Sequence, residues 1–155
     1  MTDQQKIVFK NKLKQLCQSI ITQRIDAVKI TINHAQEAAN SEEKSSAGDK
    51  YETSRAMNQL ERDMHSRQLA EIVKELANLH VIDVNRIYTV GVPGAFLQCS
   101  GISFFIAAGL GKQIVETDTI FLLSPNAPLA RILQKKKAGD HFLFNQAETK
   151  IFDIY

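Results

Sequence analysis

Apolar residues in the first half of the chain recur at steps of three and four, which is the period of an α-helix. Between about residue 4 and residue 39 these positions are Ile7, Leu13, Leu16, Cys17, Ile20, Ala27, Val28 and Ala35. A second stretch with the same steps contains Met57, Leu60, Met64, Ile72, Leu76 and Leu79. Between the two stretches, residues 41–48 lack any period and include Gly48, the only glycine before residue 79. The pattern predicts two long helices that fold back on each other as an antiparallel hairpin over residues 1–78.

The apolar positions of this hairpin are few and poor in Leu and aromatic residues. Such a thin stripe favours a solvated coiled-coil rod over helices that are covered on all sides. At 1.5 Å per residue, a helix of about 36 residues would be roughly 50 Å long. The alternative is a compact bundle, formed with the rest of the chain or with a second subunit.

From residue 79 onwards the apolar period changes, and residues that end strands become frequent. Glycines 109 and 111 indicate a hairpin turn, and Pro128 fits the first turn of a short helix over residues 127–133. Five short apolar segments predict strands at residues 86–90, 102–107, 119–123, 142–144 and 151–154. Together they predict a small α+β domain over residues 79–155, with an antiparallel sheet and one short helix.

Composition narrows the class of protein. The chain has 155 residues, of which 44% are apolar and 23% charged, as in one globular domain or two small units. No apolar run approaches the roughly 18 residues of a membrane span. The first residues lack the basic and then apolar start of a secretory signal. Cys17 and Cys99 are too few for a disulfide framework, so we expect a cytoplasmic protein with no membrane partner.

Charge is uneven, and its main feature is an acidic island near the predicted hairpin tip, at about residues 40–52. Residues 37–52 carry five acidic side chains against two lysines. Asp49 and Glu52 are three residues apart and therefore share a helical face. They can cap the second helix, with Asp49 accepting backbone N–H groups, or they can hold a hard cation such as Mg²⁺. Two carboxylates alone bind Mg²⁺ poorly, so a metal site here needs ligands from another molecule.

Other residues point less clearly to a site. Cys99 would need a base or a helix N-terminus beside it to act as a nucleophile, and its neighbours in sequence supply neither. Lys6, Lys10 and Lys14 recur every four residues along one helical face, which would either contact nucleic acid or be solvated. Residues 135–137 are three lysines that could contact phosphate but fit a solvated surface better.

Three features together resemble the bacterial Gre transcript-cleavage factors. The long N-terminal helical hairpin is the first, and Gly48-Asp49-Lys50-Tyr51-Glu52-Thr53, similar to the family's Gly-Asp-x-x-Glu-Asn, is the second. The third is Ser-Pro-Asn-Ala-Pro-Leu-Ala-Arg at 124–131 with Lys-Lys-Ala-Gly-Asp at 136–140. It is similar to the family's Ser-Pro-Leu-Ala-Arg and Gly-Lys-Lys-x-Gly-Asp. The resemblance covers essentially the whole chain.

The resemblance implies an FKBP-like C-terminal domain that docks on RNA polymerase near the outer mouth of its secondary channel. The hairpin would enter the channel as part of a monomer and bring its tip close to the 3′ end of the nascent RNA. Asp49 and Glu52, with Glu42 and Glu43 in reserve, would share Mg²⁺ with the polymerase and promote hydrolysis of a backtracked transcript. The residues implied to bind the polymerase are Ser124, Pro125, Asn126, Pro128 and Arg131.

Alternative functions follow from the departures at the tip. Thr53 stands where the family has Asn, and the Glu-Tyr that normally follows is absent. Some relatives with this architecture regulate or inhibit polymerase without cleaving RNA, so a non-cleaving regulator is the second hypothesis. Outside the family, the chain could be a small stand-alone enzyme or a coiled-coil adaptor.

Overall fold

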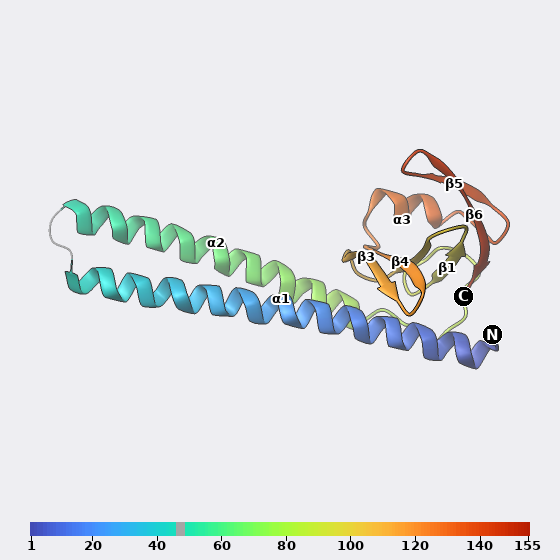
Figure 1. Cartoon of the computed structure of the whole chain (residues 1–155), viewed down its shortest axis with the longest axis horizontal. Helices are drawn as coiled ribbons and strands as arrows, with labels where there is room; N and C mark the ends of the chain where they lie inside the picture. Colours follow the sequence, from blue (N-terminus) through green and yellow to red (C-terminus); the bar gives the residue numbers. More distant parts are fainter. Residues whose placement is uncertain (46–48) are drawn as a thin grey trace. The chain divides into compact units, whose positions relative to one another are not determined.

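The computed structural model describes residues 1–45 and 49–155, and the side chains of residues 42–51 lie outside this description. Two long helices are followed by a six-stranded mixed sheet that carries one short helix (Figure 1). The predicted α+β class is confirmed. Two compact units are present, one of residues 1–20 with 78–155 and the other of residues 21–77.

Helix α1 spans Asp3–Ser45 and helix α2 spans Asp49–His80. A reciprocal pair of hydrogen bonds caps the start of α1. The backbone N–H of Gln5 donates to Thr2 Oγ1 at 3.2 Å, and the backbone N–H of Thr2 donates to Gln5 Oε1 at 2.9 Å. This capping box satisfies two N–H groups that the first turn of a helix leaves without partners.

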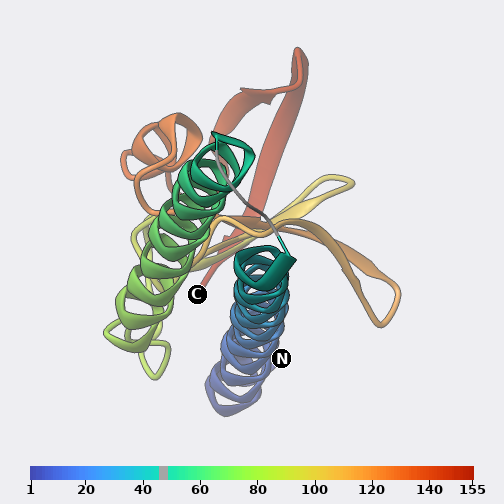
Figure 2. The same cartoon turned by 90° about the vertical axis from the view of Figure 1, so that its left-hand side faces the viewer.

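In the unit of residues 21–77 the two helices lie side by side and run in opposite directions (Figures 1 and 2). The positions of α1 that are buried or half-buried here follow steps of four and three: Ile21, Ile25, Val28, Ile32, Ala35 and Ala39. Arg62 of α2 links the helices, since its Nη1 donates to Gln36 Oε1 at 2.7 Å. The predicted long helix is therefore confirmed for α1, and its apolar stripe is confirmed at Val28 and Ala35. The prediction is wrong at Ala27, which is exposed, while Ile25 is buried.

The prediction for α2 is wrong at Met57, Leu60 and Met64, whose side chains are 65%, 67% and 53% exposed. The more covered positions of this stretch are polar: Ser54, Asn58, Arg62 and His65. The prediction fails because the apolar residues of α2 do not all lie on one side of the helix. Leu69, Ile72 and Leu76 are half-buried. Leu69 follows Met64 by five residues, about 140° around an α-helix.

The polar side of α2 is incompletely hydrogen-bonded. Arg62 Nη2 donates to Gln59 Oε1 at 2.8 Å, in addition to the Nη1 bond to Gln36. Among the described residues, Arg62 Nε and His65 Nδ1 are buried without a hydrogen-bond partner. Buried polar atoms without partners lower stability, so this stretch is less favourable than one packed on apolar side chains.

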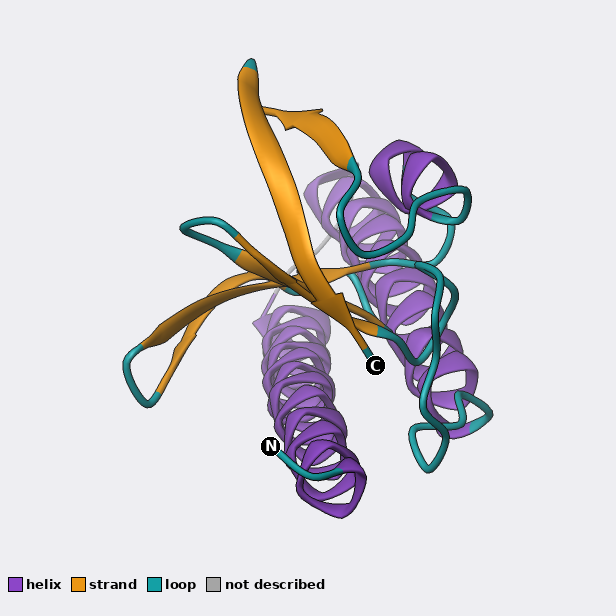
Figure 3. Cartoon of the chain, turned by 90° about the vertical axis from the view of Figure 1, so that its right-hand side faces the viewer, coloured by secondary structure: helices purple, strands orange, loops and turns teal. Residues whose placement is uncertain are grey.

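The sheet belongs to the unit of residues 1–20 and 78–155. Its strands are β1 (Phe96–Cys99), β2 (Ser103–Ile106), β3 (Gly111–Val115), β4 (Asp118–Leu123), β5 (His141–Phe144) and β6 (Ala147–Ile154). They lie in the order β3-β4-β2-β1-β6-β5 (Figure 3). Helix α3, Pro128–Leu133, connects β4 to β5.

Two features of the predicted sheet are wrong. The sheet has six strands, not five, and it is mixed because β2 and β4 are parallel while the other pairs are antiparallel. Strand β1 lies in a stretch for which no strand was predicted. The glycines at 109 and 111 were predicted to form a hairpin turn, but Gly111 begins β3. The hairpin turn comes later, where Glu116 has a φ of 59°.

Residues 86–90, predicted to be a strand, form a loop. Side chains from α1 satisfy the backbone of this region in place of a neighbouring strand. Lys10 and Lys14 donate to the carbonyl groups of His80, Ile82, Arg86 and Gly94. The hydroxyl of Tyr88 donates to the Asp83 carbonyl at 2.7 Å.

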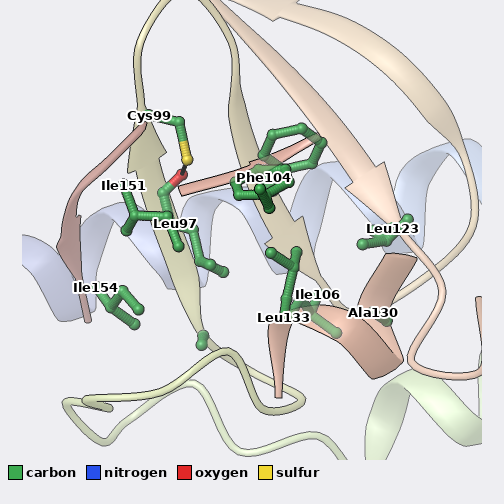
Figure 4. Packing of buried hydrophobic residues seen from close by; sticks show 11 residues of the cluster. Leu97, Cys99, Phe104, Ile106, Leu123, Ala130, Leu133, Ile151 and Ile154 are labelled. Atoms are coloured by element: carbon green, nitrogen blue, oxygen red, sulfur yellow. Dashed lines mark hydrogen bonds between the residues drawn. The ribbon is translucent and has the colours of Figure 1, made fainter. Parts of the chain in front are cut away.

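The core of the sheet unit gathers side chains from several strands and from α3 (Figure 4). Leu97, Ile106 and Leu133 are fully buried within it. The ring of Phe104 lies 5.0 Å from that of Phe144 and 5.5 Å from that of Phe142. Edge-to-face aromatic pairs of this kind add about 1 kcal/mol each beyond area burial.

The close approach of Gly91 to α3 gives a first prediction. A Cβ at this position would lie 2.4 Å from the carbonyl oxygen of Leu133, which is backbone and cannot rotate away. Gly91→Ala should therefore lower the free energy of unfolding by about 1–3 kcal/mol, measured by urea denaturation. Gly109→Ala is the control, because the nearest atom to its Cβ would be the Ser124 Cβ at 3.2 Å, and the backbone atoms of Ser124 would lie at 3.7 Å or more. Equal stability of the two variants would contradict this packing.

Candidate functional site

The acidic residues of the predicted tip lie at the facing ends of the two long helices. Asp49 is the first residue of α2, Glu52 follows in the first turn, and Glu42 and Glu43 belong to the last turn of α1. Glu52 is exposed. The side chains of Asp49, Glu42 and Glu43 lie outside the described residues, as does the predicted cap made by Asp49.

The donor chemistry of the tip suits a hard cation only in part. Carboxylate oxygens are the ligands that Mg²⁺ prefers, but this ion demands six oxygen ligands. In the described parts of the chain, no group of three or more His, Cys, Asp or Glu side chains could hold a metal ion. The side chains of Asp49, Glu42 and Glu43 lie outside those parts, so this finding does not bear on the tip itself.

The segment before α3 is shaped by its own hydrogen bonds. The backbone N–H of Asn126 donates to Ser124 Oγ at 3.3 Å, and that of Ala127 donates to the Ser124 carbonyl at 3.1 Å. Pro128 then begins α3, a position that suits proline because its missing N–H would have no partner in the helix. This turn sets the direction in which α3 leaves the sheet.

Helix α3 has one face in the core and another in solvent. Ala130 and Leu133 are buried on the first face. The second face carries two of the predicted partner-binding residues, Pro128 and Arg131, and both are exposed. A third, Asn126, is exposed in the turn before the helix. The other two, Ser124 and Pro125, are half-buried in the turn before the helix.

An exposed isoleucine adjoins these residues and was missed by the sequence analysis. Ile132 is 50% exposed although it stands beside buried Leu133. The helical period could have found it, because Ala130 and Leu133 are three residues apart and leave Ile132 on another face. We call Asn126, Pro128, Arg131, Ile132 and Lys135 the α3 surface, and all five are exposed.

The turn after α3 keeps further positive charge near this surface. Gly139 has a φ of 94°, and the backbone N–H of Lys137 donates to Asp140 Oδ2 at 2.8 Å. The Asp140 N–H in turn donates to the Lys137 carbonyl at 3.0 Å. Lys135 and Lys137 are exposed. A surface with clustered cations beside an apolar side chain suits an acidic protein partner.

The lysine stripe of α1 is neither a solvated face nor a nucleic-acid face. Lys10 is fully buried, and its Nζ donates to the carbonyls of Arg86 and Gly94 and lies 4.7 Å from the Tyr88 ring centroid. Lys6 pairs with Asp153 at 3.0 Å. The lysines are therefore used within the fold.

Burial also changes the ionisation of two groups in the sheet unit. Desolvation lowers the pKa of Lys10 to about 8, against a smaller opposing effect of Asp83. Desolvation raises the pKa of the Cys99 thiol to about 12, and this thiol donates to the Leu97 carbonyl with an Sγ–O distance of 3.7 Å. A protonated thiol is a poor nucleophile, which argues against an enzyme built on Cys99.

Comparisons with known proteins do not extend these observations. No protein-family model, no curated protein and no solved structure matches the chain. Among the described helices, none combines the length and the apolar character that crossing a membrane requires.

The buried ammonium of Lys10 gives a prediction about pH. Its pKa is lower in the folded chain than the ordinary lysine value of 10.5, so between pH 8 and 10.5 the unfolded chain binds more protons. Stability contributed by this residue should therefore rise with pH in that window, by up to about 3 kcal/mol. The measurement is the difference in unfolding free energy between wild type and Lys10→Met at several pH values, which cancels the titration of other groups. A flat difference for Lys10→Met would refute the assignment.

Proposed function

We propose that the chain is a transcription elongation factor of the Gre type. In this proposal it binds RNA polymerase, inserts the paired helices α1 and α2 into the secondary channel, and stimulates cleavage of backtracked RNA. The observation that carries the proposal is a pair of long antiparallel helices whose facing ends carry Asp49 and Glu52. Residues 21–45 of α1 alone correspond to about 37 Å of helix, a length suited to reaching into a deep channel.

The chemistry of the proposed reaction is divided between two proteins. Asp49 and Glu52 would complete a Mg²⁺ site whose other ligands belong to the polymerase, which explains why the chain needs no full metal site of its own. The bound Mg²⁺ would supply an activated water for hydrolysis of the phosphodiester. On this proposal the free chain is not an enzyme.

The same proposal includes two features of the fold. The helix pair is a coiled coil, and the sheet unit is FKBP-like. The α3 surface would dock on the polymerase. Its arginine and lysine suit an acidic partner surface, and Ile132 adds apolar area at its centre. A fold of this kind would not by itself imply prolyl isomerase activity.

A second exposed feature supports a protein partner for the helix pair. Met57, Leu60 and Met64 form an apolar patch on α2, beginning five residues after Glu52. Methionine side chains adapt to irregular surfaces and are common where a protein must pack against a partner. The walls of a protein channel would cover such a patch.

Thr53 favours one alternative within the same family. It is exposed in the first turn of α2, where the Gre factors carry Asn. A regulator that occupies the channel without cleaving RNA would need the helices and the α3 surface but not a complete metal site.

The tip is tested with stalled, backtracked RNA polymerase. Wild type with Mg²⁺ should release short 3′ RNA fragments, and Asp49→Asn combined with Glu52→Gln should lower the rate by orders of magnitude because both charged ligands are lost. The amides retain size and some capping ability, so stability should fall by only about 1 kcal/mol. Asp63→Asn combined with Glu71→Gln is the control, since it removes two exposed charges elsewhere on α2.

Each outcome at the tip assigns a different role. If the double variant cleaves as fast as wild type, the pair is only a helix cap, and Glu42 and Glu43 become the residues to test. If wild type binds polymerase but releases no fragments, the non-cleaving regulator is the function.

The α3 surface is tested by binding alone. Arg131→Ala should weaken binding to core RNA polymerase about tenfold, as for truncation of a central interface arginine. The fold should remain intact because the side chain is exposed. Lys112→Ala removes an exposed cation from β3 and serves as the control. Unchanged affinity of the folded Arg131 variant, measured by biolayer interferometry, would exclude this surface.

A further inference from the structure

A pocket of about 370 Å³ lies in the sheet unit, apart from both the tip and the α3 surface. Its walls come from the start of α1, strands β1 and β2, the β3–β4 turn and the residue after β6. This volume falls within the range of small-molecule sites, about 300–1,000 Å³. The proposed function does not use this pocket.

Three aromatic rings form one side of the pocket. Phe9 and Phe96 meet edge to face with centroids 5.2 Å apart, and Phe96 and Tyr155 have centroids 5.1 Å apart. The Tyr155 ring already attracts a cation, because Lys6 Nζ lies 4.9 Å from its centroid. Aromatic walls of this kind recognise ammonium groups through the negative face of the ring.

Acidic side chains also line the pocket. Glu116 and Asp118 are the charged side chains that line the pocket, and no lysine, arginine or histidine lines it. Glu116 pairs with Lys12 at 3.0 Å, at an exposed position. In the described parts of the chain, Asp118 has no ion-pair partner. An entering anion would meet a carboxylate without a counterion, whereas an entering cation would neutralise it.

The charges around the Tyr155 ring include both signs, because Lys6 lies over the ring and pairs with Asp153. Asp118 is a further carboxylate that acts on the ring. Burial first, and then the negative charges of Asp153 and Asp118, raise the pKa of Tyr155 to about 12. The hydroxyl side chains of Ser103 and Thr119 add hydrogen-bond acceptors to the lining. The pocket therefore combines apolar aromatic surface, acceptor oxygens and negative charge.

We propose that this pocket binds a small substituted ammonium compound. The ammonium group would lie between the aromatic wall and the Asp118 carboxylate, and its apolar substituents would contact Phe9 and Phe96. A primary amine would in addition donate hydrogen bonds to the hydroxyl oxygens. A neutral compound of the same shape would keep the apolar contacts and lose the attraction to both walls.

The full chain is titrated with choline and, separately, with 3,3-dimethylbutan-1-ol, its neutral isostere, while backbone amides are followed by NMR. Choline should shift the amides of Gly101, Ser103 and Asp118 in a saturable way, and the neutral alcohol should bind at least fivefold more weakly. Equal binding of the two compounds, or saturable binding of neither, overturns the proposal.

Variants then assign the binding to these walls. Asp118→Asn should weaken choline binding at least fivefold, and Phe9→Leu should do the same while keeping apolar volume. Glu148→Gln removes an exposed charge from β6, outside the pocket, and should change nothing. If one variant fails to fold by circular dichroism, the other still decides. Unchanged affinity in a folded variant counts against the site.

Discussion

The buried ammonium of Lys10 is the interaction on which the sheet unit depends. The chain between α2 and β1 has no regular secondary structure, yet part of its backbone is buried. Buried carbonyl groups must find donors, and here Lys10 and Lys14 provide them. Because both donors come from α1, the first helix and this loop stabilise each other, although about 70 residues separate them in sequence. The lowered pKa of Lys10 is the electrostatic cost of that arrangement.

Local periodicity predicted those elements in which the spacing of apolar residues matches the spacing of buried positions. Helices α1 and α3 are of this kind, because most of their buried positions are apolar and repeat at steps of three and four. The strands near residues 102–107 and 119–123 were found from continuous apolar runs, since three consecutive residues of β2 are buried. Strand β3 could not be found this way. It lies at the edge of the sheet, and its half-buried and exposed positions alternate. Polar Gln113 is half-buried and apolar Ile114 is exposed, so the sequence shows no matching alternation of apolar residues. The sequence of residues 86–90 predicted a strand, but the segment is a loop. Distant lysines donate hydrogen bonds to the backbone of this region, and a local pattern cannot show such donors.

The same limit applies to the candidate site. Periodicity shows that residues share a helical face, but not what that face meets. Lys6, Lys10 and Lys14 do share a face, and that face meets the protein itself. Met57, Leu60 and Met64 share another, and it meets solvent. The α3 residues were found by their motif, while Ile132 follows the 124–131 segment of that motif and was missed, although the spacing of Ala130 and Leu133 places it on another face. The pocket lined by Asp118 joins segments too distant in sequence for any local pattern to reveal.

The polar positions of α2 around Arg62 and His65 affect how easily the helix pair changes shape under force or against a partner. Leu76 is an apolar, half-buried position of α2, whereas around Arg62 and His65 the half-buried positions are polar and include atoms without a hydrogen-bond partner. Local opening should therefore require less free energy towards the ends that carry the acidic residues, so amide hydrogen exchange would quicken in that direction. A segment that needs little free energy to open can change shape to fit a rigid surface while the rest of the helix pair stays folded. We therefore expect the helix pair to deform more easily around Arg62 and His65 than near Leu76.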